Sequence, residues 1–209
     1  MLRRLFALRH YCLFRAELAA VPMAADGPAA YEFRALEAAD FACSPIAQEK
    51  GRAARFAQRL AAGHRSFGFV APGRGGPAIA FYLWLSGGAT GPGQVPLGLG
   101  LSLGLTSDLA YIWDCRTAPE HRRKRLYQQA LRHALAIAEA DGAKLALMAA
   151  ERDNRASRAG IVSAGFHEAA IVRLARLGPV LALTGGCGPR LLIGREVSLP
   201  WRELLGPTA

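Results

Sequence analysis

The hydrophobic and polar positions follow two periods along the chain, and the period predicts which segments are helices and which are strands. Over residues 126–140, apolar residues recur every three or four positions, which is typical of an amphipathic helix. Asp141 and Gly142 end this pattern, and residues 154–164 form a second predicted helix that Gly165 ends. Short apolar runs predict strands over residues 109–117, 144–149, 166–177 and 191–197.

The beginning of the chain has weaker patterns. Residues 5–18 are rich in aromatic and aliphatic side chains but alternate poorly, so a leading strand and a short helix are both consistent with them. A turn-prone break at 22–28 precedes a predicted strand at 31–36. The alanine-rich segment 37–62 predicts one or two helices, which Gly63 closes.

The middle of the chain predicts three further strands. Two apolar runs, 64–71 and 78–85, are joined by a segment of proline and glycine, which is a hairpin pattern. Glycine, threonine and proline predominate over 86–96 and predict a flexible loop. Over 97–105, five leucines alternate with glycine or serine, and this period of two predicts a single strand with a small opposite face.

The order of these elements indicates the fold class. Strands and helices alternate in the second half, and hairpin-linked strands precede them, which predicts an α/β fold built on a mixed sheet. The hydrophobic content of 52% is ample for a core. Because no internal repeat and no long linker divides the sequence, we expect one domain over residues 1–209.

Composition indicates the cellular location and the charge of possible partners more than the activity. The longest uncharged apolar run, 95–107, is too short to cross a bilayer, and arginines interrupt the N-terminal apolar residues, so we expect a cytoplasmic location without a membrane partner. The four cysteines are far apart, which indicates free thiols and no metal site. The formal net charge of +10 favours an anionic partner, such as a polyanionic cofactor or nucleic acid.

A basic turn leads directly into the predicted helix at 126–140. It contains Arg122, Arg123, Lys124 and Arg125. Unpaired N–H groups and the positive end of the helix dipole attract anions at such a junction, and the four cationic side chains add to this attraction. A solvated helix start or a nucleic-acid patch would also explain the charges, but the strand before the turn favours a phosphate-binding site.

A second motif follows the next predicted strand. Asn154 opens a helix that ends eleven residues later at Gly165 and Phe166. Together with the basic turn, this spacing resembles the acyl-CoA-binding motifs of the GNAT (GCN5-related N-acetyltransferase) superfamily, and the resemblance covers about residues 64–176. It implies a mixed, mostly antiparallel central sheet flanked by helices on both faces, acetyl-CoA as the acyl donor, and no metal.

The resemblance also assigns roles to residues of the two motifs. In the family, the amides of the turn hold the pyrophosphate of CoA, and the edge of the preceding strand pairs with the pantetheine arm. Residues 1–30 and 178–209 lie outside the motifs. The cofactor-binding residues implied are Cys115, Arg116, Thr117, Arg122, Arg123, Lys124, Arg125, Leu126, Tyr127, Asn154 and Ser157.

Three positions depart from the family pattern. Arg125 stands where the family has its first glycine, and Tyr127 stands where it has the second small residue. Because glycine adopts positive φ without strain, Arg125 must take ordinary dihedrals or accept strain, and its side chain must turn away. Ile161 stands where many relatives have a tyrosine that protonates the departing thiolate.

The sequence defines the catalytic groups less closely. Tyr127 and Tyr111 are candidate acids, with solvent as the alternative. Asp114 lies in the strand before the basic turn and is a candidate base if burial raises its pKa, although an aspartate held by hydrogen bonds would fit equally well.

The function implied is transfer of an acetyl group from acetyl-CoA to a primary amine, of a small molecule or amino sugar, by direct attack in a ternary complex. One alternative is a non-catalytic module that binds acyl-CoA or a partner. A less favoured alternative is a basic nucleic-acid-binding protein, for which affinity would fall steeply with salt. The acceptor and a homodimeric state are left open.

Overall fold

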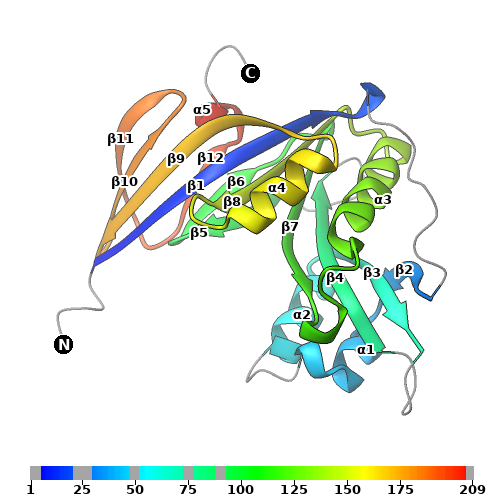
Figure 1. The fold of residues 1–209 in the computed structure, drawn as a ribbon. Helices are drawn as coiled ribbons and strands as arrows, with labels where there is room; N and C mark the ends of the chain where they lie inside the picture. Colours follow the sequence, from blue (N-terminus) through cyan, green and yellow to red (C-terminus); the bar gives the residue numbers. More distant parts are fainter. Residues whose placement is uncertain (1–5, 21–29, 48–51, 73–77, 88–92, 206–209) are drawn as a thin grey trace.

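The computed structural model describes residues 6–20, 30–47, 52–72, 78–87 and 93–205, which form two sheets and the helices around them (Figure 1). A nine-stranded sheet has the order β11-β10-β9-β1-β8-β7-β4-β3-β2, and a three-stranded sheet has the order β12-β6-β5. The strands are β1 (Phe6–Glu17), β2 (Glu32–Leu36), β3 (Arg65–Ala71), β4 (Ala78–Gly87), β5 (Gln94–Gly98), β6 (Leu101–Gly104), β7 (Leu109–Thr117), β8 (Leu145–Glu151), β9 (His167–Leu177), β10 (Val180–Gly185), β11 (Gly188–Ile193) and β12 (Val197–Pro200). The helices are α1 (Ala38–Cys43), α2 (Arg52–Ala61), α3 (Leu126–Ala140), α4 (Arg155–Ser163) and α5 (Arg202–Leu205), with 3-10 turns η2 (Leu18–Ala20), η3 (Pro45–Ala47) and η4 (Pro119–His121).

The second half of the chain has the helices that its pattern predicts. α3 has the predicted boundaries, and the apolar residues of the pattern form its buried side. Asn154 caps α4, because its side chain accepts a hydrogen bond of 3.1 Å from the backbone N–H of Ser157. Gly142 and Gly165 follow the two helices with φ of 87° and 107°, in the left-handed region that helix ends favour.

In the first half of the chain, the structure decides between the alternatives that the weak sequence pattern leaves open. Residues 5–18 lie mainly in β1, an antiparallel strand between β8 and β9. The segment 37–62 contains two helices, α1 and α2, and Gly63 has the expected positive φ of 85°. The predicted hairpin is β3 and β4. The break at 22–28 and the connection at 73–77 lie outside the described residues.

The prediction of one strand over 97–105 is wrong. β5 and β6 form an antiparallel hairpin, with the turn at Leu99 and Gly100, whose φ angles are 50° and 74°. Leucine alternation continues across this turn, so the period of two conceals it. β5 begins at Gln94, so the loop predicted at 86–96 is also too long.

The prediction of a final strand over 191–197 is wrong as well. This segment contains the end of β11 and the start of β12, which belong to different sheets. Between them the N–H of Gly194 donates to the carbonyl of Pro179 instead of continuing a ladder. The sequence pattern also missed β10, which pairs with β9 and β11.

Helices cover both faces of the large sheet, as predicted. α3 and α4 lie side by side on one face, and α1, α2 and the small sheet lie on the other (Figure 1). All neighbouring strands of the large sheet are antiparallel except β7 and β8. No helix among the described residues is long and apolar enough to cross a membrane.

The large sheet opens along β7. The parallel ladder joins Leu109–Ile112 of β7 to Leu145–Met148 of β8 and ends there. Beyond it, β7 continues along β4, with a bulge where Asp114 adopts a positive φ of 44°. The edge of β7 beyond Ile112, where β8 no longer pairs with it, is therefore available to line a site between the two strands.

Candidate functional site

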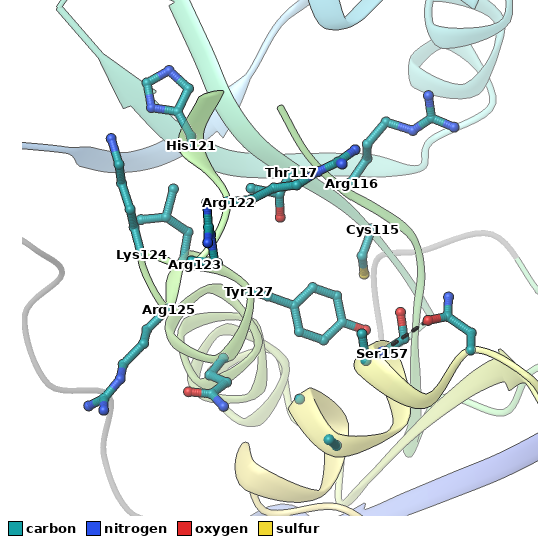
Figure 2. A pocket seen from close by; sticks show the side chains of 16 residues that line it. Cys115, Arg116, Thr117, His121, Arg122, Arg123, Lys124, Arg125, Tyr127 and Ser157 are labelled. Carbon is teal, nitrogen blue, oxygen red and sulfur yellow. Dashed lines mark hydrogen bonds between the residues drawn. The ribbon is translucent and has the colours of Figure 1, made fainter. Parts of the chain in front are cut away.

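A cavity of about 580 Å³ lies where the end of β7, the start of α3 and the first turns of α4 meet (Figure 2). Every cofactor-binding residue predicted from the two motifs lines it. Sequence reasoning missed five further lining residues, namely His121, Gln128, Ala156, Ala159 and Gly160. The last three have small side chains and share one face of α4, a pattern that could have placed them there.

The turn into α3 has a strained backbone. Arg123 and Arg125 have φ of 63° and 61°, in the left-handed region that favours glycine. Of the two alternatives for Arg125, the structure has the strained one, at a cost of about 1–2 kcal/mol. Left-handed residues in such a turn direct successive backbone N–H groups into one concavity. Figure 2 shows the side chain of Arg125 pointing away from Tyr127 and Cys115.

The charge around the cavity is positive. Its charged lining residues are Arg116, Arg122, Arg123, Lys124 and Arg125, and none of the described residues that line it is an aspartate or glutamate. Lys124 Nζ donates a hydrogen bond of 2.9 Å to the hydroxyl of Tyr31, which also bonds to His121 Nδ1 at 3.0 Å. The arrangement therefore suits a polyanion with phosphate groups.

Tyr127 extends from α3 across the cavity toward Ser157 on α4 (Figure 2). Gly160 makes room for it, since a Cβ there would lie 2.7 Å from a ring carbon of Tyr127. Burial raises the pKa of Tyr127, the nearby Cys115 raises it further, and a hydrogen bond with the Ser157 side chain acts in the opposite direction. The phenol is therefore protonated at neutral pH.

Asp114 does not line this cavity. It lies on the opposite side of β7, where its carboxylate pairs with the Arg59 guanidinium at 2.5 Å. Arg59 in turn lies over the ring of Trp113, 4.3 Å from its centroid. Of the two interpretations of Asp114, the structure therefore has a carboxylate held by a partner.

Trp113 is held by a hydrogen-bonded chain of two buried side chains, Ser86 and His64. Its indole N–H donates a hydrogen bond of 2.8 Å to the hydroxyl of Ser86, which is 2.7 Å from His64 Nδ1. Burial lowers the pKa of His64, and the charge of Arg59 lowers it further, so this imidazole is neutral at neutral pH.

Neither Tyr111 nor Cys115 adds a second reactive centre. Tyr111 is buried on the side of the sheet away from the cavity. Burial raises the pKa of the Cys115 thiol, which keeps it protonated. In the parts of the chain that the structure describes, no three histidine, cysteine, aspartate or glutamate side chains are arranged to hold a metal ion.

Comparison with known proteins agrees with this geometry. Residues 80–166 match the family model described as the acetyltransferase (GNAT) family, the same family that the two motifs resemble. This segment contains β7, the basic turn, α3 and α4. No curated protein sequence was significantly similar to the chain.

Solved structures share the fold at low sequence identity. A protein from Drosophila has a TM-score of 0.58 and 14% identity, over 83% of this chain and 52% of that one. An acetyltransferase from the GNAT family of Colwellia psychrerythraea has a TM-score of 0.53 and 12% identity, over 82% and 56%. A GCN5-related N-acetyltransferase from Kribbella flavida has a TM-score of 0.52 and 14% identity, over 83% and 60%. The chain thus spans only a little over half the length of these relatives.

Proposed function

We propose that this chain is an N-acetyltransferase that uses acetyl-CoA and a small primary amine, because residues 80–166 match the acetyltransferase (GNAT) family model. The observation that carries the proposal is the cationic cavity at the start of α3, where the edge of β7 meets the N-terminus of α4. Acetyl-CoA would supply the acetyl group as an activated thioester.

The chain has separate groups for the phosphates and for the arm of this donor. The backbone N–H groups between Arg122 and Tyr127 would bind the pyrophosphate, with Arg122, Arg123 and Lys124 adding charge. The free edge of β7 at Cys115–Thr117 would hydrogen-bond to the amides of the pantetheine arm. The N-terminus of α4, capped by Asn154, faces the same space.

Two side chains would handle protons during the transfer. A C–N bond forms as the C–S bond breaks, so one proton must leave the amine and one must reach the sulfur. Tyr127 is our candidate for the second transfer, because its buried phenol is protonated and reaches the cavity. Asp114 is the candidate for the first, and it would have to release Arg59 to act.

A specific observation keeps the non-catalytic module as a second candidate. Ile161 is fully buried at the place where many relatives have the acidic tyrosine, so donation to sulfur would depend on Tyr127 or on solvent. A protein that binds acyl-CoA without turnover would need the cavity but no proton donor.

The test measures binding and turnover separately. Acetyl-CoA should raise the melting temperature of the purified chain and bind in calorimetry, because a ligand of the native state stabilises it. Replacing Arg122 and Arg123 with glutamine should weaken this binding, and release of free CoA should be seen with some members of an amine panel. Binding without turnover would favour the module, and absence of binding would refute both.

Other sequence-based expectations stay predictions. They are a single domain over residues 1–209, a cytoplasmic location, and a homodimer as an open possibility. Binding of nucleic acid should be weak, and acetyl-CoA should compete with it at the basic turn.

A further inference from the structure

A second cavity, of about 490 Å³, lies on the other side of the end of β7. Its walls are Pro45 and Ile46 of η3, Arg116 and Thr117 of β7, and the residues Pro119 and Arg122 of the following turn. Three of these residues also line the first cavity, so the end of β7 is a common wall. A molecule in the second cavity would therefore lie next to an acyl donor in the first.

The second cavity has both cationic and apolar walls. Its charged lining residues are Arg116 and Arg122, and no described residue that lines it is acidic. The remaining walls are two prolines, Ile46 and Thr117. Arg52, the first residue of α2, donates a hydrogen bond of 2.9 Å to the carbonyl of Ile46, which holds η3 against α2. Such walls suit a small molecule with a compact apolar part and an anionic group.

A buried tyrosine lies opposite Arg116 on the neighbouring strand. Tyr82 pairs with Arg116 across β4 and β7, and the charges that act on its hydroxyl are three arginines, Arg52, Arg59 and Arg116, and one carboxylate, Asp114. The hydroxyl of Tyr82 is fully buried and has no hydrogen-bond partner among the described residues. Buried donors are normally paired, but Tyr82 does not line the second cavity, so the case for an anion there depends on the lining arginines.

The same strand offers a negative charge for an amine. Asp114 lies two residues before Arg116, and both lie on the side of β7 that faces α2 and η3. Figure 2 shows the side chain of Arg116 pointing away from Tyr127 and Ser157, toward this side. Asp114 lines neither cavity and is paired with Arg59, so an ammonium group of the acceptor would have to replace Arg59 beside it.

We propose that the second cavity binds the acyl acceptor, and that this acceptor is a small primary amine that also carries an anionic group, either a carboxylate or a phosphate. The inference rests on the proposed acetyltransferase function. Arg116 would bind the anionic group, Asp114 would attract the ammonium form of the amine, and Ile46 would contact the apolar part.

The experiment compares matched acceptors at saturating acetyl-CoA. One pair is leucine and 3-methylbutylamine, which differ in the carboxylate, and the other is glucosamine 6-phosphate and glucosamine, which differ in the phosphate. We expect kcat/KM to be at least about tenfold higher for the anionic member of one pair, since a charge-assisted hydrogen bond contributes about this factor. The pair that shows the preference identifies the anion.

Three variants test whether Arg116 is responsible. Arg116→Gln should reduce the preference to about threefold or less, because the charge that distinguishes the two acceptors is gone. Ile46→Asp, which adds a negative charge to the same cavity from another element, should have the same effect. Arg55→Gln removes an exposed arginine of α2 outside both cavities and should keep the preference. The ratio of the two acceptors is unaffected by changes in acetyl-CoA affinity or in the folded fraction.

The outcomes separate this inference from the proposed function. If the amines that lack the anionic group are turned over as well as or better than their anionic partners in both pairs, the inference is overturned and the acetyltransferase activity stays intact. A preference that survives in both Arg116→Gln and Ile46→Asp would overturn it too. Binding of acetyl-CoA with no turnover of any amine would contradict the transfer reaction, and the inference with it.

Discussion

The contact between Gly160 and Tyr127 predicts that Gly160→Ala destabilises the protein, although alanine favours helices. The new Cβ would lie 2.7 Å and 2.9 Å from two ring carbons of Tyr127, well inside the ordinary contact distance. Overpacking of this kind costs about 1–3 kcal/mol. Alanine in place of a helical glycine contributes about 1 kcal/mol in the opposite sense. We therefore expect a net loss of about 1 kcal/mol.

The decisive measurement is the same substitution without the ring. In a Tyr127→Ala background the steric conflict is gone, so Gly160→Ala should stabilise the protein by about 1 kcal/mol. Urea denaturation of the four proteins gives the free energies of unfolding, and we expect a coupling of about 2 kcal/mol between the two sites. A coupling below about 0.5 kcal/mol would refute the packing that we describe.

The same variant should also affect turnover. A shift of the Tyr127 ring moves its hydroxyl away from Ser157 and from the space beside Cys115. If Tyr127 protonates the thiolate, kcat should fall by about tenfold or more in Gly160→Ala and in Tyr127→Phe, while acetyl-CoA still binds. An unchanged kcat in Tyr127→Phe would remove Tyr127 from the reaction.

Two further predictions concern backbone strain and pH. Arg125→Gly should be more stable than Arg125→Ala by about 1 kcal/mol, because only glycine adopts the left-handed conformation without strain. Both variants should weaken acetyl-CoA binding. Equal stability of the two variants in urea denaturation would contradict the strained turn. The pKa of His64 is lower in the folded than in the unfolded protein, so the unfolded state binds more protons and stability should fall as the pH drops through about 6.5. This part of the pH dependence should be absent in His64→Gln, and a variant with the wild-type pH profile would show that another group is responsible.

Local signals in the sequence were sufficient for the elements that form the first cavity. The periodicity of residues 126–140 defines α3, and the Asn154 cap and Gly165 define α4. The basic turn lies between a strand and a helix, so its position in the cavity follows from chain order. Each of these features depends on residues that are close together in the chain.

Features that depend on distant residues could not be predicted in this way. Tyr127 can cross the cavity because a glycine stands at position 160, on another helix. Asp114 lies in the predicted strand, but its partner Arg59 comes from α2, 55 residues earlier. The hairpin turn at Leu99 is hidden for a different reason, since a leucine with positive φ gives no turn signal.

The early end of the ladder between β7 and β8 has a consequence for mechanics. Hydrogen bonds between neighbouring strands hold a sheet together, but the ladder between β7 and β8 ends at Ile112 and Met148. A ligand whose amides hydrogen-bonded to the free edge of β7 would replace the hydrogen bonds that β8 does not make there. The centre of the sheet would then be stiffer in the complex than in the protein without ligand.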